Sequence, residues 1–184
     1  MNLRIISKTF LLLIGVCALA SGPPTVQAQS LLEREYQIKA GFLYNFLKFI
    51  EWPSDVLPET SGTINICVLG DELAREAFES LNGKMVKDRR LAVRRLEPVK
   101  DLLSCHVLFI GASEEKRFPQ IMQSLRGLRV LTVGEIERFA QSGGIINFVT
   151  ERNKVRFEIN VDSAARAGLK VSSQLLSLAK VVRQ

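Results

Sequence analysis

The sequence of 184 residues lacks the residue patterns of the common enzyme classes. It has a single histidine, His106, and contains no Gly-x-Ser-x-Gly, no His-x-x-x-His and no cluster of acidic metal ligands. A lone histidine at the start of an apolar strand is usually structural. Asp71 with Glu72, and Glu114 with Glu115, stand at expected helix starts, where capping and the helix dipole explain them. We therefore predict no catalytic, metal or cofactor site.

No apolar run is long enough to span a bilayer, which takes roughly 20 residues. The run over residues 10–20 follows the positive residues Arg4 and Lys8 and precedes Val26-Gln27-Ala28. This order is typical of a signal peptide with a cleavage site after Ala28. We expect residues 1–28 to be removed and residues 29–184 to form one exported domain without a transmembrane segment. The alternative is an uncleaved N-terminal anchor.

Cysteine is scarce, and only Cys67 and Cys105 follow the expected cleavage site. An exported protein meets an oxidising compartment, where two cysteines allow a single pairing. We predict a Cys67–Cys105 disulfide, which would close a loop of about 39 residues and which the chain-entropy model rates at roughly 4 kcal/mol. The alternative is two buried thiols that never meet.

The charge is mildly basic, with 25 Lys and Arg against 19 Asp and Glu. The densest basic stretch carries one acid, Asp88, and these basic residues: Lys84, Lys87, Arg89, Arg90, Arg94 and Arg95. Outside the cytosol, an acidic protein face or anionic lipid suits such a stretch better than nucleic acid, which we do not expect as a partner. The alternative is a solvated strand edge whose charges prevent aggregation.

Residues 31–50 predict a long helix with an unusually wide apolar side. The apolar arc spans roughly 200°, whereas a one-sided surface helix needs only about 100°. Its members are Leu32, Tyr36, Ile38, Phe42, Leu43, Phe46, Leu47, Phe49 and Ile50. The helix is therefore either buried between layers of this chain or shared with a partner or a second copy in a homodimer. Glu51-Trp52-Pro53 ends it, because the residue before proline resists helical dihedrals.

Strands and helices alternate through the middle of the chain. Apolar, β-prone runs over residues 63–69, 91–96, 105–110 and 128–133 predict strands. Between and after them we expect helices over residues 71–81, 114–125 and 135–141, with Asp71 and Ser113 as caps, and a short helix or turn over residues 98–104. Such alternation predicts an α/β fold with a mostly parallel sheet and helices on both faces.

A C-terminal β-hairpin is predicted at one edge of this sheet. Residues 144–149 form its first strand, and in residues 155–161 the apolar side chains alternate with polar ones, which indicates one buried face. The turn contains Asn153, which tolerates the left-handed backbone of tight turns. Asp162 then caps a short helix that stops at Gly168, and Ser172 or Ser173 caps a second helix that continues to Val182.

Several segments together resemble the YfiR family of small secreted bacterial proteins. They are AGFLYNF at residues 40–46, FIEWP at 49–53, ICVLG at 66–70, CHVLFI at 105–110, LTV at 131–133, GGII at 143–146, VRFEIN at 155–160 and AGLKVSSQLLSLA at 167–179. The resemblance implies a periplasmic protein that binds the periplasmic sensor domain of an inner-membrane diguanylate cyclase and represses it. That repression lowers cyclic di-GMP and biofilm formation.

The same resemblance places the family's disulfide on Cys67 and Cys105. A second cysteine pair, which some members carry in their C-terminal part, is absent from this sequence. The remaining bridge is then either a redox switch or a structural staple. We predict partner contacts at Phe42, Tyr44, Trp52, Arg89 and Arg90. The alternative function is a periplasmic small-ligand-binding protein that uses the crevice at the carboxyl ends of the parallel strands.

Overall fold

The structure is a computed structural model that describes residues 24–57, 62–70, 72–96 and 99–182. Contacts divide the chain into two units, residues 1–32 and 33–184. The described part of the first unit, residues 24–32, is the beginning of helix α1, so the fold and the site described below belong to the second. Most of the expected signal peptide lies outside the described residues. None of the described helices is long and apolar enough to cross a membrane.

The helices and strands follow one another in an alternating order. The helices are α1 Pro24–Phe46, α2 Glu72–Glu79, η1 Val99–Ser104, η2 Ala112–Arg117, α3 Phe118–Ser124, α4 Val161–Arg166 and α5 Ser173–Leu176. The strands are β1 Ile50–Glu51, β2 Thr63–Leu69, β3 Met85–Val86, β4 Arg89–Arg95, β5 Val107–Ile110, β6 Leu131–Gly134, β7 Ile146–Glu151, β8 Lys154–Asn160, β9 Lys170–Val171 and β10 Lys180–Val182.

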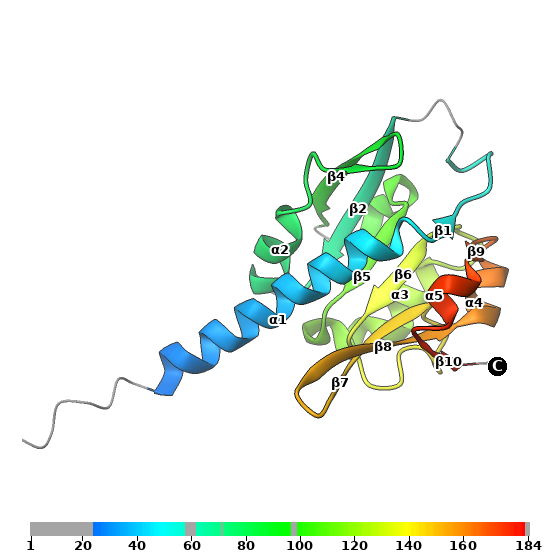
Figure 1. Ribbon diagram of the computed structural model, residues 1–184. Coiled ribbons are helices and arrows are strands. Elements are labelled where there is room, and N and C mark those ends of the chain that lie inside the picture. The colour runs from blue at the N-terminus through cyan, green and yellow to red at the C-terminus, as the bar shows by residue number, and fades with distance from the viewer. Residues whose placement is uncertain (1–23, 58–61, 71, 97–98, 183–184) are drawn as a thin grey trace, which may run out of the picture. The chain divides into compact units, whose positions relative to one another are not determined.

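One sheet of eight strands organises the second unit, in the order β10-β8-β7-β6-β5-β2-β4-β3 (Figure 1). Strands β4, β2, β5, β6 and β7 run parallel to one another. Strand β8 is antiparallel to β7, and β3 is antiparallel to β4. The predicted α/β fold with a mostly parallel sheet and a C-terminal hairpin is confirmed.

Each face of the sheet has its own apolar core. Along β2, Ile66 and Val68 join the core that contains α1 and α2, whereas Cys67 and Leu69 join the core that contains η1 and α3. This division follows from the period of two along a strand, which sends successive side chains to opposite faces. All four side chains are at most 4% exposed, so the central strand is buried on both faces.

The hairpin forms as predicted, but its second strand is buried on both faces near its end. Arg152 and Asn153 make the turn with φ values of 49° and 60°. Glu158 and Asn160, which the alternation assigned to the solvent side, are 5% and 0% exposed. Their polar groups are satisfied there: the Lys180 Nζ lies 2.9 Å from a Glu158 oxygen, and the Asn160 amide donates to the Ala140 carbonyl at 2.6 Å.

The long N-terminal helix ends earlier than predicted. Helix α1 stops at Phe46, and Ile50–Glu51 form the strand β1, which pairs with β9. Of the predicted apolar arc, Tyr36, Leu43, Phe46, Leu47 and Ile50 are buried within this chain, whereas Leu32 is 40% exposed. Ile38 is 51% exposed and is not covered.

Two of the predicted helices differ from those in the structure, one near a proline and one where a phenylalanine ring packs against two glycines. The helix expected over residues 114–125 starts as η2 and becomes α3 only at Phe118, with Pro119 at its first turn and no cap from Ser113. The helix expected over residues 135–141 is a series of turns. There the Phe139 ring fills the space where a Cβ on Gly134 or Gly144 would stand.

The C-terminal caps and the last element also differ. Asn160, not Asp162, caps α4, because its side-chain oxygen accepts the Ser163 amide. Ser172 caps α5 as one of the two predicted candidates. The helix expected to reach Val182 ends at Leu176. Strand β10 follows it and pairs parallel with β8, so β10, and not the hairpin, forms this edge of the sheet. The predicted Asp71 cap lies outside the described residues.

Candidate functional site

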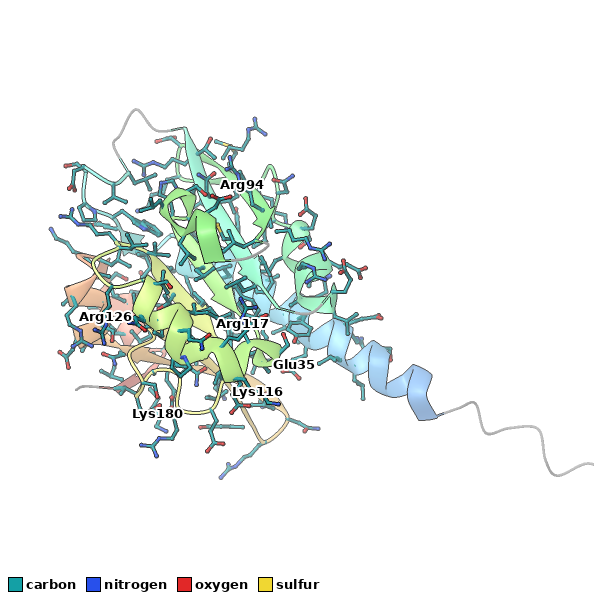
Figure 2. The ribbon with its side chains drawn as sticks, turned by 180° about the vertical axis from the view of Figure 1, so that it is seen from behind. Glu35, Arg94, Lys116, Arg117, Arg126 and Lys180 are labelled. Carbon is teal, nitrogen blue, oxygen red and sulfur yellow. A yellow bond between two sulfur atoms is a disulfide. The ribbon has the colours of Figure 1, made fainter. Side chains whose placement is uncertain are left out.

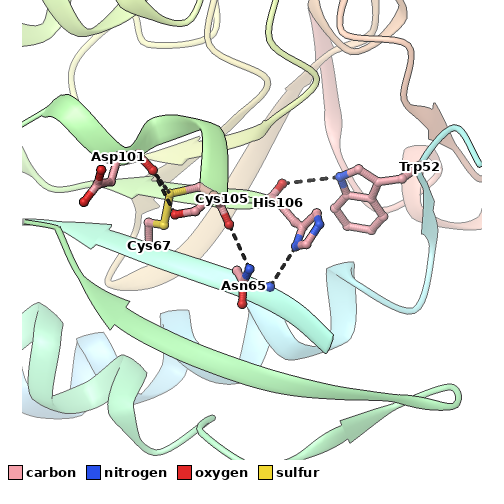
Figure 3. The surroundings of a disulfide bond; sticks show 7 residues. Trp52, Asn65, Cys67, Asp101, Cys105 and His106 are labelled. Atoms are coloured by element: carbon pink, nitrogen blue, oxygen red, sulfur yellow. Dashed lines mark hydrogen bonds between the residues drawn. A yellow bond between two sulfur atoms is a disulfide. The ribbon is translucent and has the colours of Figure 1, made fainter. Parts of the chain in front are cut away.

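The Cys67–Cys105 disulfide is present and links the sheet to the segment that precedes β5 (Figure 3). Cys67 lies in the middle of β2, and Cys105 directly follows η1, with 5.8 Å between their Cα atoms. Both residues are buried, in the core that η1 and α3 share with the sheet. The bridge therefore fixes η1 against the central strand.

His106 is held in the backbone network beside this disulfide (Figure 3). Its Nδ1 accepts the Asn65 amide at 2.9 Å, and its own amide donates to the Asn65 carbonyl at 3.0 Å. Burial lowers the pKa of His106, the Arg89 charge lowers it further, and a hydrogen bond with the Val56 backbone opposes both. The imidazole is thus a neutral acceptor that joins β2 to the start of β5, in agreement with a structural role.

Trp52 and Arg89, two of the predicted contact residues, lie around the same hollow. The Trp52 indole is half-buried and donates to the His106 carbonyl at 3.3 Å. Arg89 donates to the Leu57 carbonyl at 3.4 Å. Both side chains line a cavity of about 260 Å³, together with Lys87 of the β3–β4 turn. The tryptophan and the arginine are therefore neighbours on one surface.

Tyr44 and Arg90 lie next to that hollow. The Tyr44 hydroxyl donates to the Met85 carbonyl of β3 at 2.9 Å, and the Lys48 ammonium stands 4.4 Å from the centre of the tyrosine ring. Arg90 pairs with Met85 across the β3–β4 ladder, and its guanidinium donates to the Gly83 carbonyl at 3.3 Å. Val86, the next residue of β3, lines the Trp52 hollow, so the hollow borders the β3–β4 ladder.

We call the rim of this hollow and the adjoining β3–β4 edge the basic face; its residues are Tyr44, Lys48, Trp52, Lys84, Lys87, Arg89 and Arg90. Among the described residues, no carboxylate forms an ion pair with Lys84, Lys87 or Arg90. Arg94, further along β4, is also exposed (Figure 2). The face thus combines two half-buried aromatic rings with three cations, Lys84, Lys87 and Arg90, that form no ion pair with a described residue.

Phe42, the fifth predicted contact residue, lies apart from this face. Its ring is half-buried and stands 5.8 Å from the Phe157 ring and 6.2 Å from the Phe148 ring, between centres. It also lies 5.9 Å from Phe46 of the same helix. Phe42 therefore belongs to an aromatic cluster between α1 and the hairpin.

A buried charged cluster at the carboxyl ends of β5 and β6 was not predicted. The Lys39 ammonium lies 2.5 Å from Glu135 and 2.6 Å from Glu35, and Lys39 is only 5% exposed. The other Glu135 oxygen accepts the Tyr36 hydroxyl at 2.9 Å and the Ala112 amide at 3.1 Å. The spacing of Glu35 and Lys39 suggests an ion pair on a helix, but nothing in the sequence indicates its burial.

This cluster lies where the alternative function placed a ligand crevice. Side chains of α1 lie there against the loop that follows β6, and a Cβ on Gly111 would stand 3.1 Å from the Gly70 Cα. Among the described residues there is also no group of three metal-ligating side chains.

Two solved structures are similar to parts of this chain. A conserved domain protein from Vibrio cholerae O1 biovar El Tor is 11% identical, with a TM-score of 0.47, over 71% of this chain and 57% of that one. An ABC domain from Streptococcus pneumonia, in complex with L-Trp, is 10% identical, with a TM-score of 0.47, over 70% of this chain and 57% of that one. The chain thus spans little more than half the length of either protein.

The comparison with protein families is more specific. A family model described as "DUF4154: YfiR/HmsC-like" matches residues 36–180, which include nearly all of the second unit and both cysteines of the disulfide. The chain belongs to the YfiR/HmsC-like family.

Proposed function

We propose that this protein is a periplasmic repressor that binds the periplasmic sensor domain of an inner-membrane diguanylate cyclase. Its family is regulatory and non-catalytic, and diguanylate cyclase signalling is the process that the family controls. The observation that carries the proposal for this chain is the basic face, where two aromatic rings lie beside cations, of which Lys84, Lys87 and Arg90 form no ion pair with a described residue. Repression lowers cyclic di-GMP and, with it, biofilm formation.

The basic face has the composition of a protein-binding surface. Tyrosine, tryptophan and arginine are the residues that most often dominate binding energy, and they do so where the partner excludes water. Tyr44 and Trp52 are each held by a hydrogen bond to a backbone carbonyl, so little rotamer freedom remains to be lost on binding. The cations around them favour an acidic surface on the partner and accelerate the encounter.

A repressor of this kind acts by a shift in population. It binds the inactive form of the cyclase more tightly than the active form, and a tenfold effect on the equilibrium requires about 1.4 kcal/mol of difference. Loss of one well-packed aromatic anchor changes binding by about 2 kcal/mol or more, which is roughly 30-fold. A single residue of the basic face is therefore enough to remove repression.

Capture from solubilised membranes tests this proposal. The purified, oxidised domain, residues 29–184, is immobilised, and the captured membrane proteins are identified by mass spectrometry. We expect a protein with a diguanylate cyclase domain, and we expect Tyr44→Ala, Trp52→Ala and Arg90→Glu to reduce its recovery. Arg156→Glu, an exposed arginine near the hairpin turn, is the matched control. Failure of the wild-type domain to capture any cyclase would refute the proposal.

Cellular cyclic di-GMP gives the functional half of this test. Expression of the full chain is expected to lower cyclic di-GMP, and the basic-face variants are expected to lose that effect at equal protein levels. Repeating the capture after reduction of Cys67–Cys105 separates a redox switch from a staple, because only a switch loses the partner on reduction. Phe42→Ala tests the predicted contact at that residue, whose ring now packs between α1 and the hairpin.

A further inference from the structure

A second site, which shares no residue with the basic face, lies at the amino ends of β6 and β7. A cavity of about 560 Å³ opens there between α3, the loop before β7 and α4. Its volume is within the range of about 300–1,000 Å³ that small-molecule sites occupy. Arg126 at its rim is visible in Figure 2 on the side of the molecule where α4 lies.

The floor of this cavity is apolar and its rim is polar. Leu125, Val130 and Ile145 form the floor and are 7%, 5% and 2% exposed. Met122 and Leu128 are half-buried beside them. A flexible methionine adapts its shape to different apolar groups, which suits a wall against a planar or aliphatic ligand.

The polar groups that line the cavity are mainly hydrogen-bond donors. Arg126 and Arg166 are both at the rim, and the lining contains no aspartate or glutamate. Arg126 forms no ion pair with any described residue. One Arg166 nitrogen donates to the Ser163 hydroxyl at 2.8 Å, which positions its guanidinium at the cavity wall.

Two buried hydroxyls add to this donor set. Thr132 is 4% exposed and its oxygen accepts the Ile145 amide at 2.9 Å, while the Ser163 oxygen accepts from Arg166. Within the described part of the chain, no acceptor takes the proton of either hydroxyl. A buried hydroxyl proton without an acceptor is costly, and a ligand that brings acceptor atoms would satisfy it.

We propose that this cavity binds a small organic anion, namely a carboxylate with an apolar body. The body would contact Met122, Leu128 and the buried floor, and the carboxylate would accept from Arg126 and from the lining hydroxyls. Charge-assisted hydrogen bonds of this kind are roughly twice as strong as neutral ones. The site is separate from the basic face, so it does not depend on the repressor function.

Isothermal titration with matched probes tests the site on the purified, oxidised domain, residues 29–184. The probes are 1-naphthoate, the neutral 1-naphthamide of the same shape, and sulfate as an anion without an apolar body. We expect 1-naphthoate to bind at least tenfold more tightly than either of the others. Equal affinity of naphthoate and naphthamide, or no binding of naphthoate at millimolar concentration, overturns the proposal.

Three variants locate the binding. Arg126→Gln removes the cation and Met122→Trp fills the cavity without a change of charge, and each is expected to weaken naphthoate binding at least tenfold. Arg156→Gln, an arginine near the hairpin turn and outside the lining, is the matched control and should bind as the wild type does. All three side chains are exposed or half-buried, so we expect the three variants to fold. Circular dichroism checks that each variant is folded. Wild-type affinity in both Arg126→Gln and Met122→Trp overturns the assignment to this cavity.

Discussion

Replacement of Glu135 should destabilise the protein more than replacement of its partner Lys39. Glu135 accepts from three donors, the Lys39 ammonium at 2.5 Å, the Tyr36 hydroxyl at 2.9 Å and the Ala112 amide at 3.1 Å, and its side chain is 7% exposed. Glu135→Leu therefore leaves one buried cation and two neutral donors without this acceptor. Lys39→Met leaves the carboxylate with both of its neutral donors.

The magnitudes follow from these contacts. Removal of one partner of a buried ion pair costs about 3–5 kcal/mol, and we expect about 4 kcal/mol for Glu135→Leu. For Lys39→Met we expect about 2 kcal/mol, because the remaining hydrogen bonds stabilise the charge of Glu135. The double variant should lose about 3 kcal/mol, well below the sum of the single losses, because neither Lys39 nor Glu135 is then left buried without the other.

Urea unfolding of the three variants, followed by circular dichroism, measures these differences. An unchanged m value would show that the midpoint reports stability alone. For a domain of this size, 1 kcal/mol corresponds to a shift of about 2–4 °C in the melting temperature, so Glu135→Leu should melt about 8–16 °C lower. If the single losses add in the double variant, or if Lys39→Met is the more damaging change, the proposed role of the pair is wrong.

Three further predictions concern the rest of the second unit. Cys67→Ala/Cys105→Ala should lower the free energy of unfolding by about 2–4 kcal/mol, measured in urea against the oxidised protein, because the bridge spans a sequence separation of 38. Burial lowers the pKa of His106 below its ordinary 6.5, so the unfolded chain binds that proton more readily than the folded protein does. The contribution of His106 to the free energy of unfolding should therefore be complete above about pH 6.5 and decrease below it. In His106→Gln, the free energy of unfolding should depend less on pH. Asn160→Ala should lose about 2 kcal/mol in thermal unfolding, because it removes the α4 cap and the bond to Ala140.

The parallel sheet was predictable because its signals are local. The apolar runs of β2 and β5 are buried on both faces, as in any central parallel strand, and the hairpin alternates around a turn with a left-handed asparagine. The elements that the sequence did not predict depend on distant partners. Strand β1 exists because it pairs with β9, and β10 exists because it pairs with β8.

The candidate sites were predictable to a smaller extent for the same reason. The basic stretch and Trp52 stand out in the sequence, and the structure brings Trp52 next to Arg89 and Tyr44 next to the β3–β4 ladder. Phe42 carries the same aromatic signal and packs with the hairpin instead. The lining of the anion cavity comes from three separate segments of ordinary composition, so no local pattern could have indicated it.

The arrangement of the sheet explains why the two proposed sites avoid the usual ligand position of α/β folds. That position is the crevice at the carboxyl ends of the strands where the strand order reverses, which here is between β2 and β5. Gly70 and Gly111 approach closely there, and α1 places Lys39 and Tyr36 against Glu135 at the adjacent strand ends. The basic face lies instead at the β3–β4 edge, and the anion cavity at the opposite ends of β6 and β7. Because no residue is common to the two, a ligand can alter partner binding only through a change in the fold, and by linkage the partner would then alter the affinity for the ligand by the same factor.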